Sequence, residues 1–163
     1  MSETYRVRLD KEYHVFSAAH FITFNRDVCE ELHGHNYRVA VEVDGPLDEN
    51  CYVVDFIALR DALKAVTDTL EHRVLLPTQH PLIRVQADER EVVATFADRR
   101  WVFPRLGCAL LSLPNTTAEL LARHIARCLA AELARRTGFQ PRRLQVAVDE
   151  SNGQWGIYES SAE

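Results

Sequence analysis

Residues 33–43 constrain the fold more tightly than any other part of the chain. Every second residue in this run is apolar or a histidine: His33, His35, Tyr37, Val39, Val41 and Val43. Such alternation is typical of a strand with one buried face, so we expect a strand from His35 to Val43. Successive side chains of a strand point to opposite faces. His33 and His35 should therefore leave the same face, with Cα atoms roughly 6.5–7 Å apart.

A third histidine, His20, follows another alternating segment, Tyr5 to Ser17, which we read as the first strand. If the two strands pair, His20 can supply a third imidazole to one ion. Imidazole is the commonest protein ligand for zinc, and three protein ligands with one open position are typical of catalytic zinc. We therefore predict a zinc ion on His20, His33 and His35. The alternatives are another first-row ion or three ordinary polar histidines.

Cys29 stands four residues before His33, in a charged loop. A lone cysteine is more often a small buried apolar residue than a nucleophile. A nearby metal ion would lower the pKa of the thiol, whereas Glu30 and Glu31 oppose this by like-charge repulsion. We predict that Cys29 is catalytic, as a nucleophile or a base.

Glu71, His72 and Glu150 are further candidates. A carboxylate can orient a histidine that acts as a general base, although a solvated helix end explains Glu71-His72 equally well. Glu150 continues the apolar face of its strand, where a carboxylate is costly to bury without partners. Glu150 either binds the hydrogen-bond donors of a ring-shaped ligand or reaches water at the strand end.

Two helices are expected. The first runs from Phe56 to Leu70 behind the N-cap Asp55. Its apolar stripe comprises Phe56, Leu59, Leu63, Val66 and Leu70. The second runs from near Thr116 to about Arg136. Thr116-Thr117-Ala118-Glu119 matches the S/T-x-x-E capping box, so capping is preferred to catalysis for Glu119.

The remaining elements are strands. A hairpin pairs Leu144–Glu150 with Gln154–Tyr158 around Asn152-Gly153. Between the helices, from about His80 to Leu113, short apolar runs separated by charged turns predict an inserted β segment. These runs are residues 82–85, 92–96 and 101–103. The order ββ-α-(β insertion)-α-ββ predicts an α+β fold in one domain over residues 1–163.

Composition excludes some function classes. A formal net charge of −5 argues against non-specific nucleic-acid binding. No signal pattern or long apolar span stands out, so we expect no membrane association. The four cysteines form no Cys-x-x-Cys pair, and a reduced cytoplasmic setting is the simplest interpretation.

Taken together, these motifs resemble the 6-pyruvoyl-tetrahydropterin synthase superfamily. The resemblance spans about residues 5–76 and 114–158. Its motifs are Phe16-Ser17-Ala18-Ala19-His20, Cys29-x-x-x-His33-Gly34-His35-Asn36, Val54-Asp55-Phe56, Leu70-Glu71-His72, Asn115-Thr116-Thr117-Ala118-Glu119 and Val148-Asp149-Glu150-Ser151. The spacing of Cys29 from His33 is similar to that of the bacterial 6-carboxy-tetrahydropterin synthases of queuosine biosynthesis.

The resemblance implies the tunnelling fold, an antiparallel sheet with helices on one face that oligomerises into a β-barrel. It implies a homohexamer, a dimer of trimers, with active sites at subunit interfaces. The implied reaction converts 7,8-dihydroneopterin triphosphate to 6-carboxy-5,6,7,8-tetrahydropterin, with loss of acetaldehyde and triphosphate.

The same resemblance implies a role for each candidate residue. His20, His33 and His35 would hold Zn²⁺, Cys29 would move protons, and His72 with Glu71 would act on the other face. Glu150 would anchor the pterin, and Thr116 to Glu119 would line the pocket. Arg26, Arg38 and Arg73 are candidates for binding the triphosphate.

The chain departs from the family pattern at Glu71, where relatives generally carry aspartate, and in the insertion. Two alternatives therefore stay open. The first is another product, 6-pyruvoyl-tetrahydropterin or 6-hydroxymethyl-dihydropterin, and Glu30, three residues before His33, favours the latter. Glu71 and the insertion favour a zinc- or pterin-binding protein without catalysis.

Overall fold

Seven strands form the main sheet of the computed structural model, which describes residues 3–12, 14–25 and 27–162. Its strands are β1 (Tyr5–Leu9), β2 (Val15–His20), β5 (His33–Gly45), β6 (Arg73–Pro77), β10 (Cys108–Leu111), β11 (Arg143–Ser151) and β12 (Gln154–Ser161). The strand order is β10-β6-β2-β5-β11-β12, and β1 also pairs with β5. β6 runs parallel to both β2 and β10. The sheet is therefore mixed, and the prediction of a wholly antiparallel sheet is wrong.

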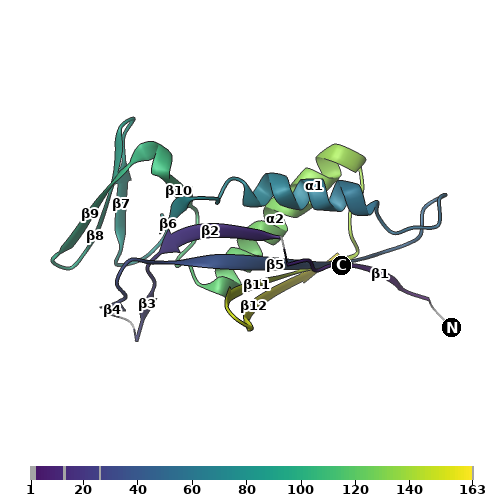
Figure 1. The fold of residues 1–163 in the computed structure, drawn as a ribbon, viewed down its shortest axis with the longest axis horizontal. Coiled ribbons are helices and arrows are strands. Elements are labelled where there is room, and N and C mark those ends of the chain that lie inside the picture. Colours follow the sequence, from purple (N-terminus) through teal and green to yellow (C-terminus); the bar gives the residue numbers. More distant parts are fainter. Residues whose placement is uncertain (1–2, 13, 26, 163) are drawn as a thin grey trace.

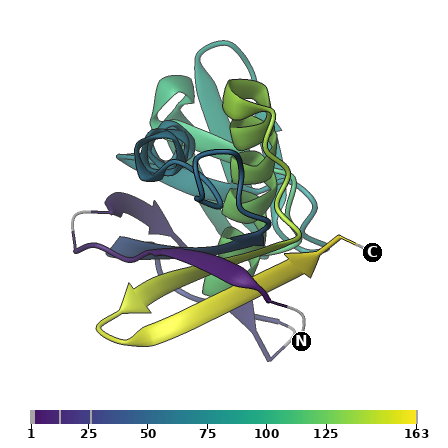
Figure 2. The same cartoon turned by 90° about the vertical axis from the view of Figure 1, so that its right-hand side faces the viewer.

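Both helices, α1 (Phe56–Thr67) and α2 (Ala118–Thr137), cover the same face of this curled sheet (Figures 1 and 2). Apolar side chains of β2, β5 and β11 pack against them to form the main core. On the opposite face Arg6 and Arg143 both pair with Asp44, and the apolar residues Ala40, Ala147 and Ile157 line a neighbouring groove. In the described part of the chain, neither helix combines the length and apolar character needed to cross a bilayer.

The predicted first strand is wrong as one continuous element. β1 pairs with Val41–Gly45 and β2 pairs with His33–Arg38 of the same long strand, β5. Five residues of sequence separate β1 from β2, whereas only Val39 and Ala40 of β5 lie between the two pairings. The amide of Val39 donates to the carbonyl of His14, which restores the hydrogen bonding at the break.

The first helix is close to its prediction but shorter. The Asp55 carboxylate accepts a hydrogen bond from the amide of Ile57, which confirms the predicted N-cap. The helix ends at Thr67, and Leu70 is buried just beyond it. Phe56 is 57% exposed, so its assignment to the buried stripe is wrong. It is the first helical residue, where the chain enters from solvent.

The predicted capping box at the second helix is also wrong. The N-cap is Thr117, not Thr116, and its side chain makes no capping hydrogen bond. The carbonyl of Thr116 instead accepts a hydrogen bond from His20. Glu119 therefore lies one position too early to complete the box. At the other end, Gly138 adopts φ +73°, the left-handed conformation that closes many helices.

The inserted β segment is confirmed as a separate three-stranded antiparallel sheet (Figure 1). Its strands are β7 (Arg84–Ala87), β8 (Glu91–Phe96) and β9 (Arg99–Pro104). A short 3₁₀ turn, η1 (Arg105–Gly107), then leads to β10, which returns to the main sheet and was not predicted. A small hairpin of β3 (Thr23–Phe24) and β4 (Val28–Cys29) lies between β2 and β5.

The C-terminal hairpin is confirmed, with Asn152 and Gly153 both at positive φ in the turn. β12 passes closely under the start of α2. A Cβ at Gly156 would lie 2.4 Å from the carbonyl carbon of Ala118 and 2.5 Å from the amide nitrogen of Glu119. Only glycine permits this approach, which sets the height of α2 above the sheet.

We therefore expect Gly156→Ala to lower the free energy of unfolding by about 1–3 kcal/mol, because backbone must shift to relieve the overlap. Urea unfolding measures this change. Gly107→Ala is the matched control, since a Cβ at Gly107 would meet nothing within 4 Å. Equal unfolding free energies for the two variants would contradict the predicted role of Gly156.

Candidate metal centre and active site

Three histidines converge on the helix-covered face of the sheet. The antiparallel pairing of β2 with β5 sets His20 directly opposite His33, as expected from the sequence. His35 leaves the same face of β5 two residues further on. The candidate ligand nitrogens of His20, His33 and His35 all lie within 4.8 Å of one another. Their side chains can therefore reach a common ion.

Backbone carbonyls orient two of the three rings. The Nδ1 atom of His20 donates to the carbonyl of Thr116 at 2.9 Å, and that of His33 donates to the carbonyl of Glu31 at 2.8 Å. Because a carbonyl only accepts, Nδ1 carries the hydrogen and Nε2 presents its lone pair. This is the arrangement in which histidine binds a metal.

Two of the Nε2 atoms make no hydrogen bond in the described part of the chain. Those of His20 and His35 are buried without a hydrogen bond among the described residues. A buried polar atom without a partner is costly, so it requires an explanation. The chemistry of this donor set fits a divalent metal ion such as zinc.

Burial also keeps these rings neutral. It lowers the pKa of His20 to about 4, with His33 and His35 lowering it further against the opposing hydrogen bond to Thr116. Burial likewise lowers the pKa of His35, and the nearby His33 adds to the effect. Neutral imidazole is the form that binds metals, so the lowered pKa values of His20 and His35 favour metal binding.

Two carboxylates border the histidines. Glu30 Oε2 lies 3.9 Å from Nε2 of His33, and Glu150 Oε1 lies 3.8 Å from Nε2 of His35. Glu150 continues the buried face of β11, as predicted, and it remains partly exposed. Burial raises the pKa of Glu150, followed by the negative charge of Glu30 and, more weakly, of Glu119. Glu119 therefore lies close to the same region of the site.

One residue near the cluster was missed by sequence reasoning. The ring of Tyr37 packs edge-on against those of His20 and His35, and its buried hydroxyl has no partner among the described residues. Tyr37 continues the His33-His35 alternation on the same face of β5. That alternation was the available signal, but it was interpreted only as core packing.

Cys29 is 5% exposed and belongs to a second apolar cluster between the main sheet and the insertion. Its Sγ makes a weak hydrogen bond of 3.5 Å to the carbonyl of Glu30. Burial raises the pKa of the thiol, Arg99 opposes this, and Glu30 and Glu31 add to the rise as anticipated. The protein surroundings alone therefore favour the neutral thiol at pH 7.

Glu71 and His72 form a close pair although they are adjacent in sequence. Glu71 Oε1 lies 3.2 Å from Nδ1 of His72, while Oε2 accepts a hydrogen bond from the amide of Ser17 at 2.7 Å. His72 adopts φ +53°, an uncommon conformation for a residue other than glycine. Such strain persists only where surrounding contacts enforce it, and it is concentrated at functional sites.

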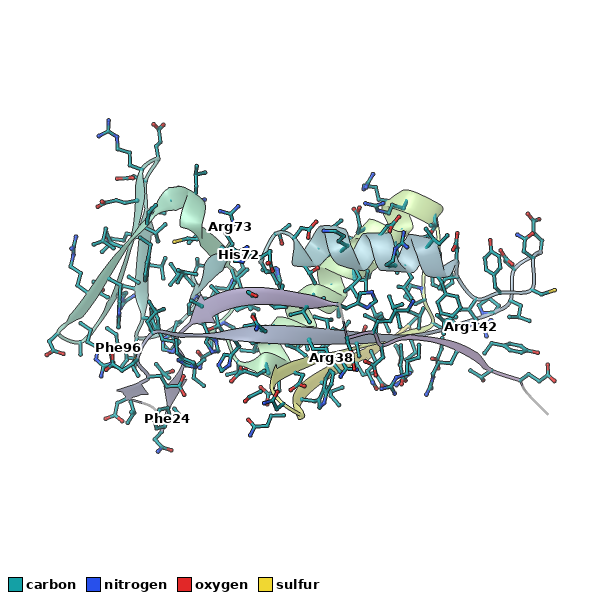
Figure 3. The ribbon with its side chains drawn as sticks, in the orientation of Figure 1. Phe24, Arg38, His72, Arg73, Phe96 and Arg142 are labelled. Carbon is teal, nitrogen blue, oxygen red and sulfur yellow. The ribbon has the colours of Figure 1, made fainter. Side chains whose placement is uncertain are left out.

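His72 borders a groove of about 440 Å³ whose lining also includes His35 of the histidine cluster. Ser17, Gly34 and Asn36 line this groove, and each neighbours in sequence a residue that faces the helices. The imidazole of His72 is largely exposed beside Arg73 at the start of β6 (Figure 3). One groove thus links His72 to the edge of the histidine cluster at His35.

The three candidate arginines differ in their surroundings. Arg73 lines the groove beside His72. Arg38 pairs with Asp10 at 2.5 Å and lies over the ring of Trp155. Arg26 lies outside the described residues. Arg73 is therefore the better placed of the two described candidates for binding an anionic substrate group.

Comparisons with known proteins identify the family of the chain. The sequence model of the family described as 6-pyruvoyl tetrahydropterin synthase matches residues 8–161. A Methanocaldococcus jannaschii protein, provisionally named 6-carboxy-5,6,7,8-tetrahydropterin synthase, is 30% identical over 145 residues, or 88% of each chain. The Haemophilus influenzae 6-carboxy-5,6,7,8-tetrahydropterin synthase is 32% identical over 124 residues, covering 72% of this chain and 78% of that protein.

The fold has a close counterpart among solved structures. The crystal structure of 6-pyruvoyl tetrahydropterin synthase from Plasmodium vivax superposes with a TM-score of 0.90 at 24% identity. The match covers 99% of this chain and 100% of that one, so it includes the inserted sheet. This likeness shows the fold.

Proposed function

Because the chain belongs to the 6-pyruvoyl tetrahydropterin synthase family, we propose that it is a zinc-dependent lyase of the 6-carboxy-tetrahydropterin type. It converts 7,8-dihydroneopterin triphosphate to 6-carboxy-5,6,7,8-tetrahydropterin and releases acetaldehyde and triphosphate. The observation that carries the proposal is the convergence of three histidine nitrogens within 4.8 Å, with Glu150 at their edge. The names of the two relatives favour the carboxy product.

In this proposal His20, His33 and His35 hold the zinc, which supplies Lewis-acid polarisation of the substrate's side-chain hydroxyls. The carboxylate of Glu150 accepts hydrogen bonds from the amino and ring N–H groups of the pterin. A pterin bound in this way would lie beside the metal ligands, because Glu150 Oε1 is 3.8 Å from Nε2 of His35. Thr116 contributes through its carbonyl, which orients His20, and Glu119 lines the pocket near Glu150.

In this proposal Cys29 and His72 carry out the proton transfers. Cys29 moves protons at the side-chain carbons of the substrate from the loop that leads into β5. His72 acts from the other face, and the Glu71 carboxylate at 3.2 Å holds its Nδ1 and stabilises the charged imidazolium. Glu71 can take the role of an aspartate in orienting His72, because the amide of Ser17 donates to Oε2 of Glu71 and so fixes the carboxylate.

The side chain of His72 is 81% exposed, whereas His20 of the cluster is completely buried. We therefore propose a homo-oligomer, a hexamer built as a dimer of trimers, in which His72 of the partner subunit completes the site around His20, His33 and His35. The largely exposed imidazole of His72, beside a groove that also reaches His35, supports this assembly.

A second product is favoured by one observation. The carboxylate of Glu30 lies 3.9 Å from His33, whereas the Cys29 thiol is buried with a raised pKa. A glutamate base in this position suits formation of 6-hydroxymethyl-dihydropterin, whereas 6-pyruvoyl-tetrahydropterin is the other alternative product. Binding of zinc and pterin without turnover defines the third possibility, a non-catalytic protein.

Product analysis tests these proposals directly. Zinc-loaded protein is incubated with 7,8-dihydroneopterin triphosphate, the pterins are identified by mass spectrometry, and acetaldehyde is measured separately. We expect 6-carboxy-tetrahydropterin and acetaldehyde in equal amounts. A pyruvoyl or hydroxymethyl product would move the protein to the second proposal. Pterin binding without any product would reject the lyase.

A further inference from the structure

The loop between β2 and β5, residues 21–32, carries Cys29 and Glu30 and packs against the inserted sheet. Arg99, the first residue of β9, reaches across to it. Nη1 of Arg99 donates to the carbonyls of Cys29 at 3.0 Å and of Glu30 at 3.2 Å. Nη2 lies 3.2 Å from the carboxylate of Glu31. One guanidinium thus contacts three consecutive residues of the loop.

The insertion also holds the beginning of the same loop. Phe21 is fully buried and stacks on Trp101 of β9, with ring centroids 4.4 Å apart. The hydroxyl of Thr23 accepts from Nε2 of His80 at 2.7 Å. That ring nitrogen carries the hydrogen, because Nδ1 of His80 accepts from two backbone amides. Side chains between residues 80 and 101 therefore hold both ends of the loop.

This loop connects directly to the histidine cluster. The carbonyl of Glu31 accepts the hydrogen bond that orients His33, and Phe21 directly follows His20. A shift of the backbone at residues 29–31 would move the thiol of Cys29 and turn the ring of His33 together. Metal ligands depend on such partners, and losing one typically costs about 10–100-fold in affinity.

We propose that the inserted sheet is a positioning device for the loop at residues 21–32, and that Arg99 is its principal contact. Arg99 is a positioning residue, which acts through the backbone of Cys29, Glu30 and Glu31. Guanidinium suits this task because its planar fork donates to several acceptors at once, whereas the ammonium of lysine is a single point charge. The expected effect of Arg99 on turnover rests on the proposed function, whereas its expected effect on amide exchange in the loop does not.

The test compares Arg99→Ala, Arg99→Lys and Arg100→Ala, with the last as the matched control. Arg100 is the next residue of β9, is exposed and, among the described residues, makes none of the loop contacts of Arg99. Amide hydrogen exchange of residues 21–32 is followed by mass spectrometry. The affinity for zinc is measured by competition with a chelator.

For Arg99→Ala we expect at least about tenfold faster exchange in the loop, because unpinned loops open locally, while exchange in α2 stays unchanged. Zinc affinity should fall about 10–100-fold. Arg99→Lys should lie between wild type and Arg99→Ala, and Arg100→Ala should match wild type. If the lyase assay succeeds, kcat should fall more than KM rises.

The outcomes separate the two proposals. Wild-type exchange and zinc affinity in Arg99→Ala would reject the positioning role, whatever the protein's reaction is. Faster loop exchange and weaker zinc binding in a protein that forms no product would retain the positioning role and reject the proposed function. Faster exchange in α2 as well would assign Arg99 to general stability and also reject the specific role.

Discussion

Replacing His33 with alanine is expected to abolish tight zinc binding and turnover together. The substitution removes one of three imidazoles that converge within 4.8 Å. Two remaining ligands hold zinc far less well, so we expect the affinity to fall by at least about 100-fold, more than the loss of an outer-shell partner. Metal analysis after dialysis against a weak chelator gives the zinc content per chain, and the product assay gives turnover.

His33 is the best member of the cluster for this test because its side chain is 38% exposed, so its removal leaves no large cavity. His20 is completely buried, and its loss would also disturb the core. His124 in α2 provides the control, because His124→Ala should keep its zinc. Undiminished zinc content in His33→Ala would reject the proposed ligand set.

The second large effect is expected from Cys29→Ala, which should lower kcat by about 10²–10⁴-fold while zinc content stays unchanged. This range is typical for the loss of a general acid or base. Cys108→Ala is the matched control, since Cys108 is a buried cysteine of the same apolar cluster. Product formation and zinc content are measured for both variants.

Retained turnover in Cys29→Ala would remove the thiol from the mechanism. The role would then pass to Glu30, whose carboxylate lies 3.9 Å from His33. In that case Glu30→Gln should abolish turnover, because the amide has the shape of the acid but cannot take up the proton. Loss of activity in both variants would assign complementary tasks to the thiol and the carboxylate.

Local patterns in the sequence were sufficient to predict much of the fold. Alternation identified β5, and the turn residues Asn152 and Gly153 located the terminal hairpin. Pairings that depend on distant segments were not predictable in this way. β10 pairs in parallel with β6, although the whole inserted sheet separates the two strands in sequence. The break between β1 and β2 depends on how both strands align with β5.

The same distinction between local patterns and contacts of distant segments applies to the candidate site. The three histidines were predicted because strand periodicity and one strand pairing are enough to bring them together. The contacts of Arg99 with Cys29 and Glu30 span about 70 residues of sequence and carry no local signature. The groove beside His72 could not be predicted from the sequence either. It is bordered by a residue with positive φ, next to a hydrogen bond between the distant residues Ser17 and Glu71.

The position of β5 in the sheet has a consequence for the order of folding. One edge of β5 pairs with β1 and β2, which are made before it, whereas the other edge waits for β11 near the end of the chain. Contacts between distant segments form slowly, and an unpaired strand edge invites aggregation until they do. During synthesis the histidine cluster can therefore assemble from β2 and β5 well before Glu150 emerges. The metal half of the site should precede the substrate-anchoring half, and a nascent chain would expose the open edge of β5 in the interval.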